Sequence, residues 1–180
     1  MGIYLALNIV VAIIVVLAVI YILYRLFVWK QGNENVMLIV KRRTPFLVES
    51  KDFNSVTLYT DIPFTNKGTQ LGTIMDLFPR HLLPCEQFDG VTVTSWGQHL
   101  DRTDRQDGYF ESYIVKPKTG GTVRIHVTFT GLNGNIMNDI QGLPDMNIDI
   151  YYQVVGRTYY RITKQRIRMT EEEVARALAQ

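Results

Sequence analysis

The stretch from Ile3 to Tyr24, IYLALNIVVAIIVVLAVIYILY, divides the chain into two unlike parts. It contains no charged residue and no proline, and Asn8 is its one strongly polar side chain. Its 22 residues, rising about 1.5 Å each, form a helix of roughly 33 Å, which matches a hydrocarbon core of about 30 Å. The stretch therefore predicts a single transmembrane helix, and residues 1–30 form a membrane anchor with its interfacial flank.

The flanks of this helix favour a retained signal anchor over a cleaved signal peptide. A signal peptide has a basic start, a short apolar core and a small-x-small cleavage site, and none of these is present. Aromatic and basic side chains prefer the membrane interface. The residues predicted at that interface are Tyr4, Tyr21, Tyr24, Arg25, Trp29 and Lys30.

The distribution of charge around the helix predicts its orientation. Lysine and arginine follow the apolar stretch and do not precede it, at Arg25, Lys30, Lys41, Arg42 and Arg43. Positive charge favours the cytoplasmic side, so the C-terminal domain is predicted in the cytoplasm. A periplasmic or extracellular domain is the alternative, because long domains can translocate regardless of charge.

One face of the predicted helix suggests association with another helix. Asn8, Ala12, Val15 and Val19 follow one another at spacings of four, three and four, which places them on one face. A buried amide among small and β-branched residues is typical of helix contacts in membranes. Alternatively, Asn8 bonds to its own helix or to water among the headgroups.

The remaining residues, about 150, are enough for one globular domain. Residues 31–54 are predicted to form a linker and the first short strands, and the apolar run 36–40 is either a buried strand or a second membrane-contacting segment. Residues 55–169 contain runs of alternating polar and apolar residues separated by turn residues, the last two joined by a two-residue turn at Gly156 and Arg157. Seven or eight such strands without helices between them predict an all-β antiparallel sandwich, with a barrel as the alternative.

A short C-terminal helix is predicted over residues 170–180. Thr170 followed by Glu173 has the spacing of a capping box, and Val174, Ala177 and Leu178 form a narrow apolar face. A helix this short is marginally stable alone, so we expect it to dock on another surface.

One part of the strand region carries a family resemblance. The segment from Val56 to Gly68, followed by 71–76, resembles immunoglobulin-like sandwiches, in which a strand ends in a polar N-x-G turn and a second strand returns the chain. Membrane-anchored modules of this kind, among them desiccation-related and bacterial adhesion-related ones, are similar over about 20 residues. The resemblance implies a binding or spacer module, and the Cys…Trp…Cys signature of antibody domains is missing, since Cys85 is the one cysteine.

An acidic segment is the best candidate for metal binding. Asp101, Asp104 and Asp107 lie in DRTDRQDG, but their spacing of three differs from the alternation of calcium loops, and two arginines neutralise them. A solvated loop is the plainer interpretation, and a C2-like calcium site would need acids from a second loop, such as Asp61 or Asp149.

No catalytic motif stands out in the sequence. Cys85 with His81 or His99 would make a thiol–imidazole pair only if the fold brought them together, and Pro84 argues against a helix that would align them. His126 falls on the polar side of its strand. We therefore expect no cofactor and no enzymatic activity.

The last hairpin is rich in basic residues interleaved with tyrosines. Its basic patch comprises Arg157, Arg161, Lys164, Arg166 and Arg168. Such a patch can meet anionic lipid, or it can protect an edge strand from aggregation. The formal net charge of +2 and the membrane anchor argue against nucleic acid as a partner.

Together these features predict a single-pass membrane protein that acts as an accessory, scaffold or adaptor subunit. Its partners would be the lipid bilayer and a membrane-associated protein or a second copy of the chain. The alternative is a C2-like peripheral domain that senses lipid or calcium.

Overall fold

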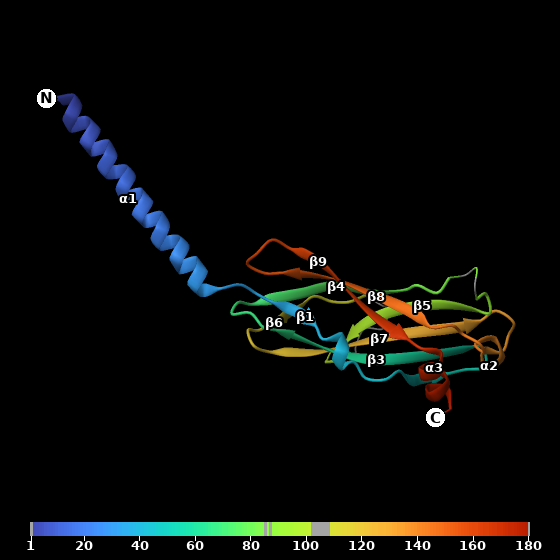
Figure 1. Ribbon diagram of the computed structural model, residues 1–180. Coiled ribbons are helices and arrows are strands. Elements are labelled where there is room, and N and C mark those ends of the chain that lie inside the picture. The colour runs from blue at the N-terminus through green and yellow to red at the C-terminus, as the bar shows by residue number, and fades with distance from the viewer. Residues whose placement is uncertain (1, 85, 87, 102–108, 180) are drawn as a thin grey trace.

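The computed structural model describes residues 2–84, 86, 88–101 and 109–179. Helix α1, Gly2–Gln31, projects from one end of an elongated body of β-strands (Figure 1). None of its residues is buried, and it is long and apolar enough to cross a membrane. A signal sequence near an N-terminus would meet the same criterion.

The body of the domain is made of strands joined by short loops. The strands are β1 Val36–Leu38, β2 Leu47–Lys51, β3 Ser55–Asn66, β4 Gly72–His81, β5 Val91–His99, β6 Tyr113–Val115, β7 Gly120–Gly131, β8 Met146–Val155 and β9 Arg161–Met169. The described part of the domain also contains three short helical elements: η1 Val40–Arg42, α2 Ile136–Asp139 and α3 Glu171–Leu178.

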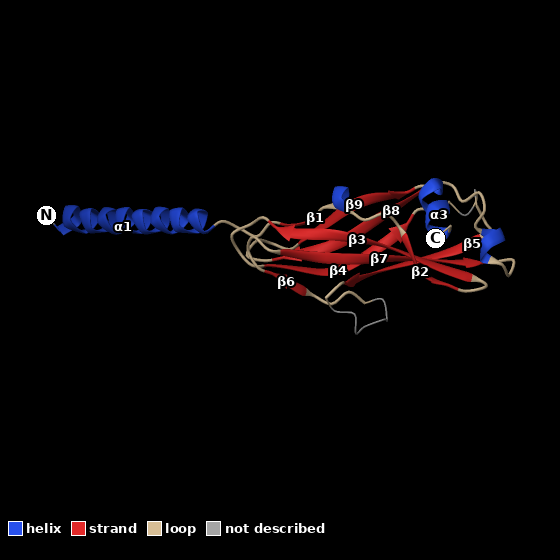
Figure 2. Ribbon diagram, turned by 90° about the horizontal axis from the view of Figure 1, so that it is seen from below, coloured by secondary structure: helices blue, strands red, loops and turns tan. Residues whose placement is uncertain are grey.

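These strands form two antiparallel sheets (Figure 2). Within the described residues, one sheet has the order β1-β3-β7-β5 with β2 also paired to β3, and the other has the order β6-β4-β8-β9. Apolar residues alternate inward along the strands; in β3, Val56, Leu58 and Ile62 are fully buried. Each such side chain contributes about 1.5–3 kcal/mol through burial. The predicted antiparallel sandwich is confirmed.

The apolar run after the linker belongs to the sandwich. β1 pairs with the end of β3, with Val36 opposite Asn66 and Leu38 opposite Phe64. Val36 and Leu38 are buried in the core. This part of the run is therefore a strand of the sandwich, as the buried-strand interpretation predicts, with Met37 on the opposite, half-buried face.

Asn66 holds the segment after α1 against the domain. Its buried amide accepts hydrogen bonds from the backbone N–H of Asn35 and Gly68, each at 2.9 Å, and donates to the carbonyls of Gln70 and Val115 at 2.8 and 3.1 Å. Neither Asn66 nor Gly68 adopts a positive φ in this turn. Gly68 is needed because a Cβ there would collide with the carbonyl oxygen of Asn33.

The hairpin of β8 and β9 has a longer connection than predicted. Val154 pairs with Arg161, and residues 156–160 form the loop in place of a two-residue turn. The carboxylate of Glu34 accepts hydrogen bonds from the backbone N–H of Arg157, at 3.0 Å, and from the hydroxyl of Thr158. This distant carboxylate holds the loop in its wider shape.

Helix α3 begins and docks as predicted, although its capping box is incomplete. The Thr170 hydroxyl accepts from the backbone N–H of Glu173 at 3.2 Å. The Glu173 carboxylate binds Arg43 at 2.7 and 2.8 Å and the backbone N–H of Phe46 at 3.1 Å, so it does not return to Thr170. Val174 and Ala177 are buried against the sandwich.

Candidate functional site

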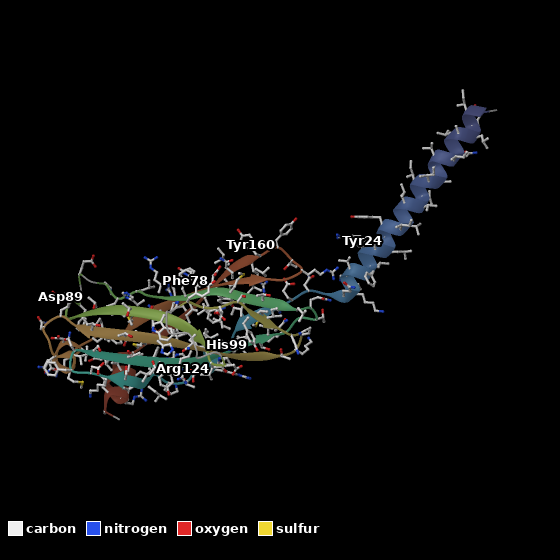
Figure 3. The ribbon with its side chains drawn as sticks, turned by 180° about the vertical axis from the view of Figure 1, so that it is seen from behind. Tyr24, Phe78, Asp89, His99, Arg124 and Tyr160 are labelled. Atoms are coloured by element: carbon white, nitrogen blue, oxygen red, sulfur yellow. The ribbon has the colours of Figure 1, made fainter. Side chains whose placement is uncertain are left out.

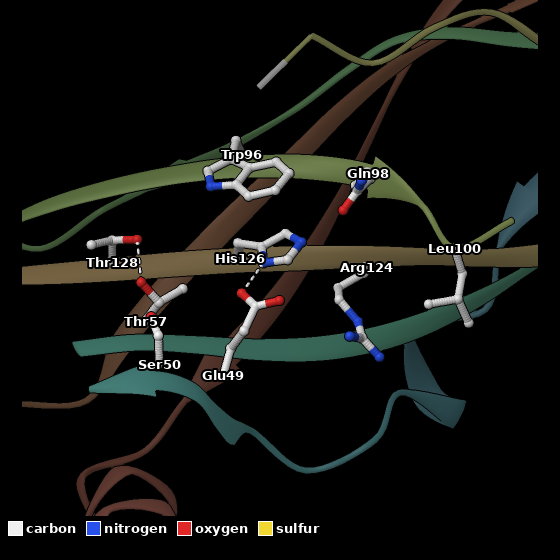
Figure 4. Close-up of a pocket in the computed structure, with 9 residues that line it drawn as sticks. All are labelled: Glu49, Ser50, Thr57, Trp96, Gln98, Leu100, Arg124, His126 and Thr128. Carbon is white, nitrogen blue, oxygen red and sulfur yellow. Dashed lines mark hydrogen bonds and ion pairs between the residues drawn. The ribbon is translucent and has the colours of Figure 1, made fainter. Parts of the chain in front are cut away.

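The outer face of the five-stranded sheet carries a cavity of about 530 Å³ (Figure 4). Its lining residues come from β2, β3, β5 and β7 and from the residue that follows β5: Glu49, Ser50, Thr57, Trp96, Gln98, Leu100, Arg124, His126 and Thr128. We refer to this set as the face pocket. Its lining is polar and aromatic, in contrast to the aliphatic core on the opposite side of the same strands.

A β-bulge in β2 aims Glu49 into the face pocket. Val48 pairs with Leu58 and Ser50 with Thr57, so Glu49 is an extra residue without a partner in the ladder. Bulges bend a strand and redirect a side chain. As a result, a Glu49 carboxylate oxygen lies 2.6 Å from Nδ1 of His126 (Figure 4).

His126 lies under an indole ring at the base of the face pocket. Trp96 is its cross-strand partner in β5, and the two rings stack with centroids 3.7 Å apart and planes 5° apart. Only 1 % of His126 is exposed. The sequence placed this histidine correctly on the polar side of β7, but Trp96 covers it, so that side of the strand is not open to solvent here.

Burial and the neighbouring carboxylate act in opposite directions on the pKa of His126. Burial lowers the pKa of the imidazole below its usual value, although the Glu49 carboxylate acts in the opposite direction. With Nδ1–H donating to Glu49, the neutral ring presents an acceptor at Nε2. That atom is buried and has no hydrogen-bond partner among the described residues.

Arg124 forms a separate ion pair beside the histidine. Its guanidinium donates to Asp61, the residue opposite it in β3, at 2.8 and 3.0 Å, and lies 3.9 Å from the centroid of the Tyr59 ring. Hydrogen bonding to Asp61 raises the pKa of Arg124. The pair fixes the planar cation at the rim of the face pocket.

Several polar side chains of the face pocket are hydrogen-bonded to one another. The hydroxyls of Thr57 and Thr128 bond to each other at 2.9 Å, and the carboxylate of Glu49 is engaged by His126. Within residues 2–84, 86, 88–101 and 109–179, no group of three His, Cys, Asp or Glu side chains could hold a metal ion.

Several side chains of the predicted basic patch form ion pairs with aspartates, which the sequence analysis did not predict. Arg166 binds Asp149 at 2.6 and 2.9 Å, Lys164 lies 3.4 Å from the same carboxylate, and Arg168 pairs with Asp145. Arg157 donates to the side chain of Gln31 at 2.7 Å. β9 is an edge strand, so the charged-edge interpretation matches the topology.

The predicted acidic cluster lies largely outside the described residues. Asp104 and Asp107 fall there, while Asp101 is exposed and donates its backbone N–H to Nδ1 of His99 at 3.1 Å. Asp61 and Asp149, named as second-loop ligands, are both paired with arginine.

The hypothetical thiol–imidazole pair lies partly outside the described residues. Cys85 is outside the described residues, His81 lies beside Val93 near the start of β5, and His99 ends that strand. His99 stacks on Tyr113 at 4.0 Å between the sheets.

The residues predicted to act in the membrane all lie on α1. The interface residues Tyr4, Tyr21, Tyr24, Arg25, Trp29 and Lys30 and the association face Asn8, Ala12, Val15 and Val19 are exposed along this helix. The domain covers none of them, so they are available to lipid or to another helix.

Sequence reasoning missed the pairing of Glu49, Trp96 and His126. The sequence pattern that could have indicated this cluster is the two-residue alternation, which places Trp96 and His126 on the outward face of their strands. The sequence around Glu49 contains no pattern that predicts the β-bulge, which turns this side chain toward Trp96 and His126.

A family profile matches the sandwich. The profile of the N-terminal immunoglobulin-like domain of F420-0:gamma-glutamyl ligase matches residues 42–169. Among curated proteins, no sequence matches significantly.

Several solved structures resemble the domain at low identity. The GAE domain of yeast GGA1 has 9% identity and a TM-score of 0.33, covering 69% of this chain and 87% of its own. The GAE domain of GGA2p from Saccharomyces cerevisiae has 8% identity and a TM-score of 0.35, covering 75% and 97%. A FixG-related protein from Vibrio parahaemolyticus has 10% identity and a TM-score of 0.33, covering 78% and 97%.

The profile match spans most of the sandwich, from η1 to the end of β9. The chain therefore belongs to the family of the immunoglobulin-like domain found at the N-terminus of F420-0:gamma-glutamyl ligase.

Proposed function

We propose that the chain is a single-pass membrane protein whose immunoglobulin-like domain is a non-enzymatic accessory or adaptor module that binds a protein partner beside the bilayer. The observation that carries this proposal is the joint between α1 and the domain. The Gln31 carbonyl accepts hydrogen bonds from the Thr69 hydroxyl at 2.6 Å and from the Gln70 amide at 3.1 Å.

The joint supports a retained anchor. Gly32 adopts φ +67° and donates its N–H to the carbonyl of Trp29, which ends the helix with a left-handed residue. The last helical carbonyl is thus satisfied by the domain itself. A cleaved signal peptide would not need side chains of the mature domain to bind its final turn.

The apolar surface of α1 requires a non-aqueous surrounding. Its side chains from Ile3 to Tyr24 are exposed, and each large one gains about 1.5–3 kcal/mol when removed from water. The domain does not cover them, which supports a surrounding of lipid or of other helices. The basic residues after the helix favour a cytoplasmic domain.

The face pocket is the surface we assign to the protein partner. It combines a partly exposed Trp96 with polar side chains whose hydrogen bonds are mostly made within the domain. Aromatic side chains on a rigid sheet are common anchors in protein interfaces. Because these groups are already ordered, binding would cost little side-chain entropy.

Two measurements on the full-length protein test the anchor. After alkaline washing, the chain is expected in the membrane pellet, and its intact mass is expected to include residues 2–24. A chain released by the wash, or one recovered without those residues, contradicts the anchor.

The partner surface is tested in mild detergent with two matched arginine variants. Thr94→Arg lies on the exposed outer face of β5, beside the face pocket, and Gln153→Arg lies on the outer face of the other sheet. Loss of the co-purifying protein in Thr94→Arg alone supports the assignment. Equal recovery with both variants contradicts it.

A further inference from the structure

The end of the sandwich next to α1 is built from loops that are distant in sequence. Residues 31–35, 66–71, 115–119 and 155–161 meet there, and Figure 1 shows these connections around the end of α1. Hydrogen bonds join them: Lys67 N–H to Asn35 at 2.9 Å, Lys118 N–H to Asn66 at 2.9 Å, and Arg157 to Gln31 at 2.7 Å. We call this set the proximal end.

The proximal end is strongly basic. Its four segments contain five basic residues and one acid. The bases are Lys67, Lys116, Lys118, Arg157 and Arg161. The acid is Glu34, which is 7% exposed and whose carboxylate is occupied by the 156–160 loop. Positive charge therefore dominates what this end presents to solvent.

The far half of the domain has the opposite character. Segments 51–54, 88–90, 131–145 and 170–179 contain seven acids and two basic residues. Asp89 lies at the end opposite α1 (Figure 3). The segments at the two ends of the domain thus differ in the sign of their charge, although the formal net charge of the chain is only +2.

The proximal end also exposes apolar and aromatic side chains. Tyr159 is 96% exposed and Tyr160 66%, and Ile162, which follows this set in β9, is 65% exposed. Figure 3 shows Tyr160 directed away from the sandwich, on the side toward which α1 runs. The Glu34 carboxylate fixes the base of this loop, so the tyrosines are held out by the fold.

We propose that the proximal end is a second membrane contact, in which Tyr159 and Tyr160 enter the headgroup region of an anionic leaflet and the surrounding basic residues bind its phosphates. This inference rests on the proposed membrane anchor. Tyrosine prefers the membrane interface, and each nearby lysine or arginine adds about 1 kcal/mol on an anionic surface.

Lipid is favoured over a protein partner at this end because of its continuity with α1. The carbonyl and side chain of Gln31 are bound by three residues of the proximal end, so any bilayer that holds α1 lies directly against these loops. The acidic far half then points away from the anionic surface, which lowers electrostatic repulsion.

Depth-dependent quenching by brominated lipids tests the contact in the full-length protein. The chain contains two tryptophans, Trp29 in α1 and Trp96 in the face pocket. The loop variant is Trp29→Phe with Tyr160→Trp. The matched control is Trp29→Phe with Phe53→Trp, since Phe53 is also highly exposed but lies in the far half.

The proteins are reconstituted into vesicles containing phosphatidylglycerol and brominated phosphatidylcholine. We expect quenching of the loop variant to be about twofold greater than that of the control, and the difference to shrink in vesicles without phosphatidylglycerol. Equal quenching of the two variants overturns the contact. A difference that is unchanged without anionic lipid overturns the assigned lipid class.

The unsubstituted protein separates this test from the anchor itself. If Trp29 is quenched in the unsubstituted protein while the indole introduced by Tyr160→Trp is not, the anchor stands and the second contact is wrong. If the unsubstituted protein is quenched no more than Trp29→Phe, α1 is not in the bilayer, and both proposals fail.

Discussion

The indole of Trp96 stacks directly on the imidazole of His126, with ring centroids 3.7 Å apart and planes 5° apart. The contact joins neighbouring strands β5 and β7 and covers the histidine from solvent. Glu49 reaches the same ring from β2. Three strands therefore share one buried titratable group, whose protonation should be visible in the stability of the domain.

We expect stability to decline below about pH 6.5. Burial holds the pKa of His126 below its usual value, so the unfolded chain takes up this proton first as the pH falls. Stability is full above the unfolded pKa and is lost from there down to the folded pKa, at about 1.4 kcal/mol per pH unit for one group.

Urea unfolding of the protein in detergent between pH 7.5 and 5 measures this slope. His126→Gln should flatten it in part. His81, whose pKa is also lowered by burial, should account for the remainder and serves as the comparison variant. An unchanged slope in His126→Gln contradicts the assignment.

Glu173→Gln should loosen α3. Burial alone would raise the pKa of Glu173, but hydrogen bonds from Arg43 and from the N–H of Phe46 outweigh it and lower the pKa. Weakening these charged contacts should cost about 1–3 kcal/mol. Amide exchange in residues 171–178 is the measurement, with exposed Glu172→Gln as control. Equal exchange in the two variants contradicts the role.

Asn66→Ala should destabilise the whole domain. The substitution leaves two backbone N–H groups and two carbonyls without their partners in a buried place, at an expected cost of about 3 kcal/mol. Asn147→Ala, an exposed asparagine in β8, is the matched control and should be close to neutral. Comparable urea midpoints for the two variants would contradict this expectation.

Glu34→Ala should release the β8–β9 loop. The N–H of Arg157 and the hydroxyl of Thr158 lose their shared acceptor, so amide exchange across residues 156–160 should accelerate. Glu172→Ala, in the far half of the domain, provides the control. Unaltered exchange in this loop would show that other contacts hold it.

Asn8→Leu should weaken association of α1 if the face of Asn8, Ala12, Val15 and Val19 contacts another helix. The variant removes an amide that can bond across helices in a medium without water. Cross-linking in membranes measures the effect, and Val10→Leu, on another face, is the control. Identical cross-linking of Asn8→Leu and the unsubstituted chain would contradict association through this face.

Local patterns in the sequence determined much of the architecture. The unbroken apolar run of α1, the alternation Val56, Leu58, Ile62 in β3, and Thr170 at the start of α3 each depend on neighbours in the chain. Such patterns specify an element and its buried face because helix and strand periods are fixed by backbone geometry.

Tertiary structure alone decided which groups meet. The bulge at Glu49 turns one carboxylate toward His126, Asp149 neutralises Arg166 and Lys164, and Glu34 fixes a loop more than a hundred residues away. Strand register and loop shape choose these partners, and both depend on long-range pairing. The two-residue period of a strand predicts only which side chains face outward. The residue that pairs with each of them across the sheet is set by the register of the neighbouring strand.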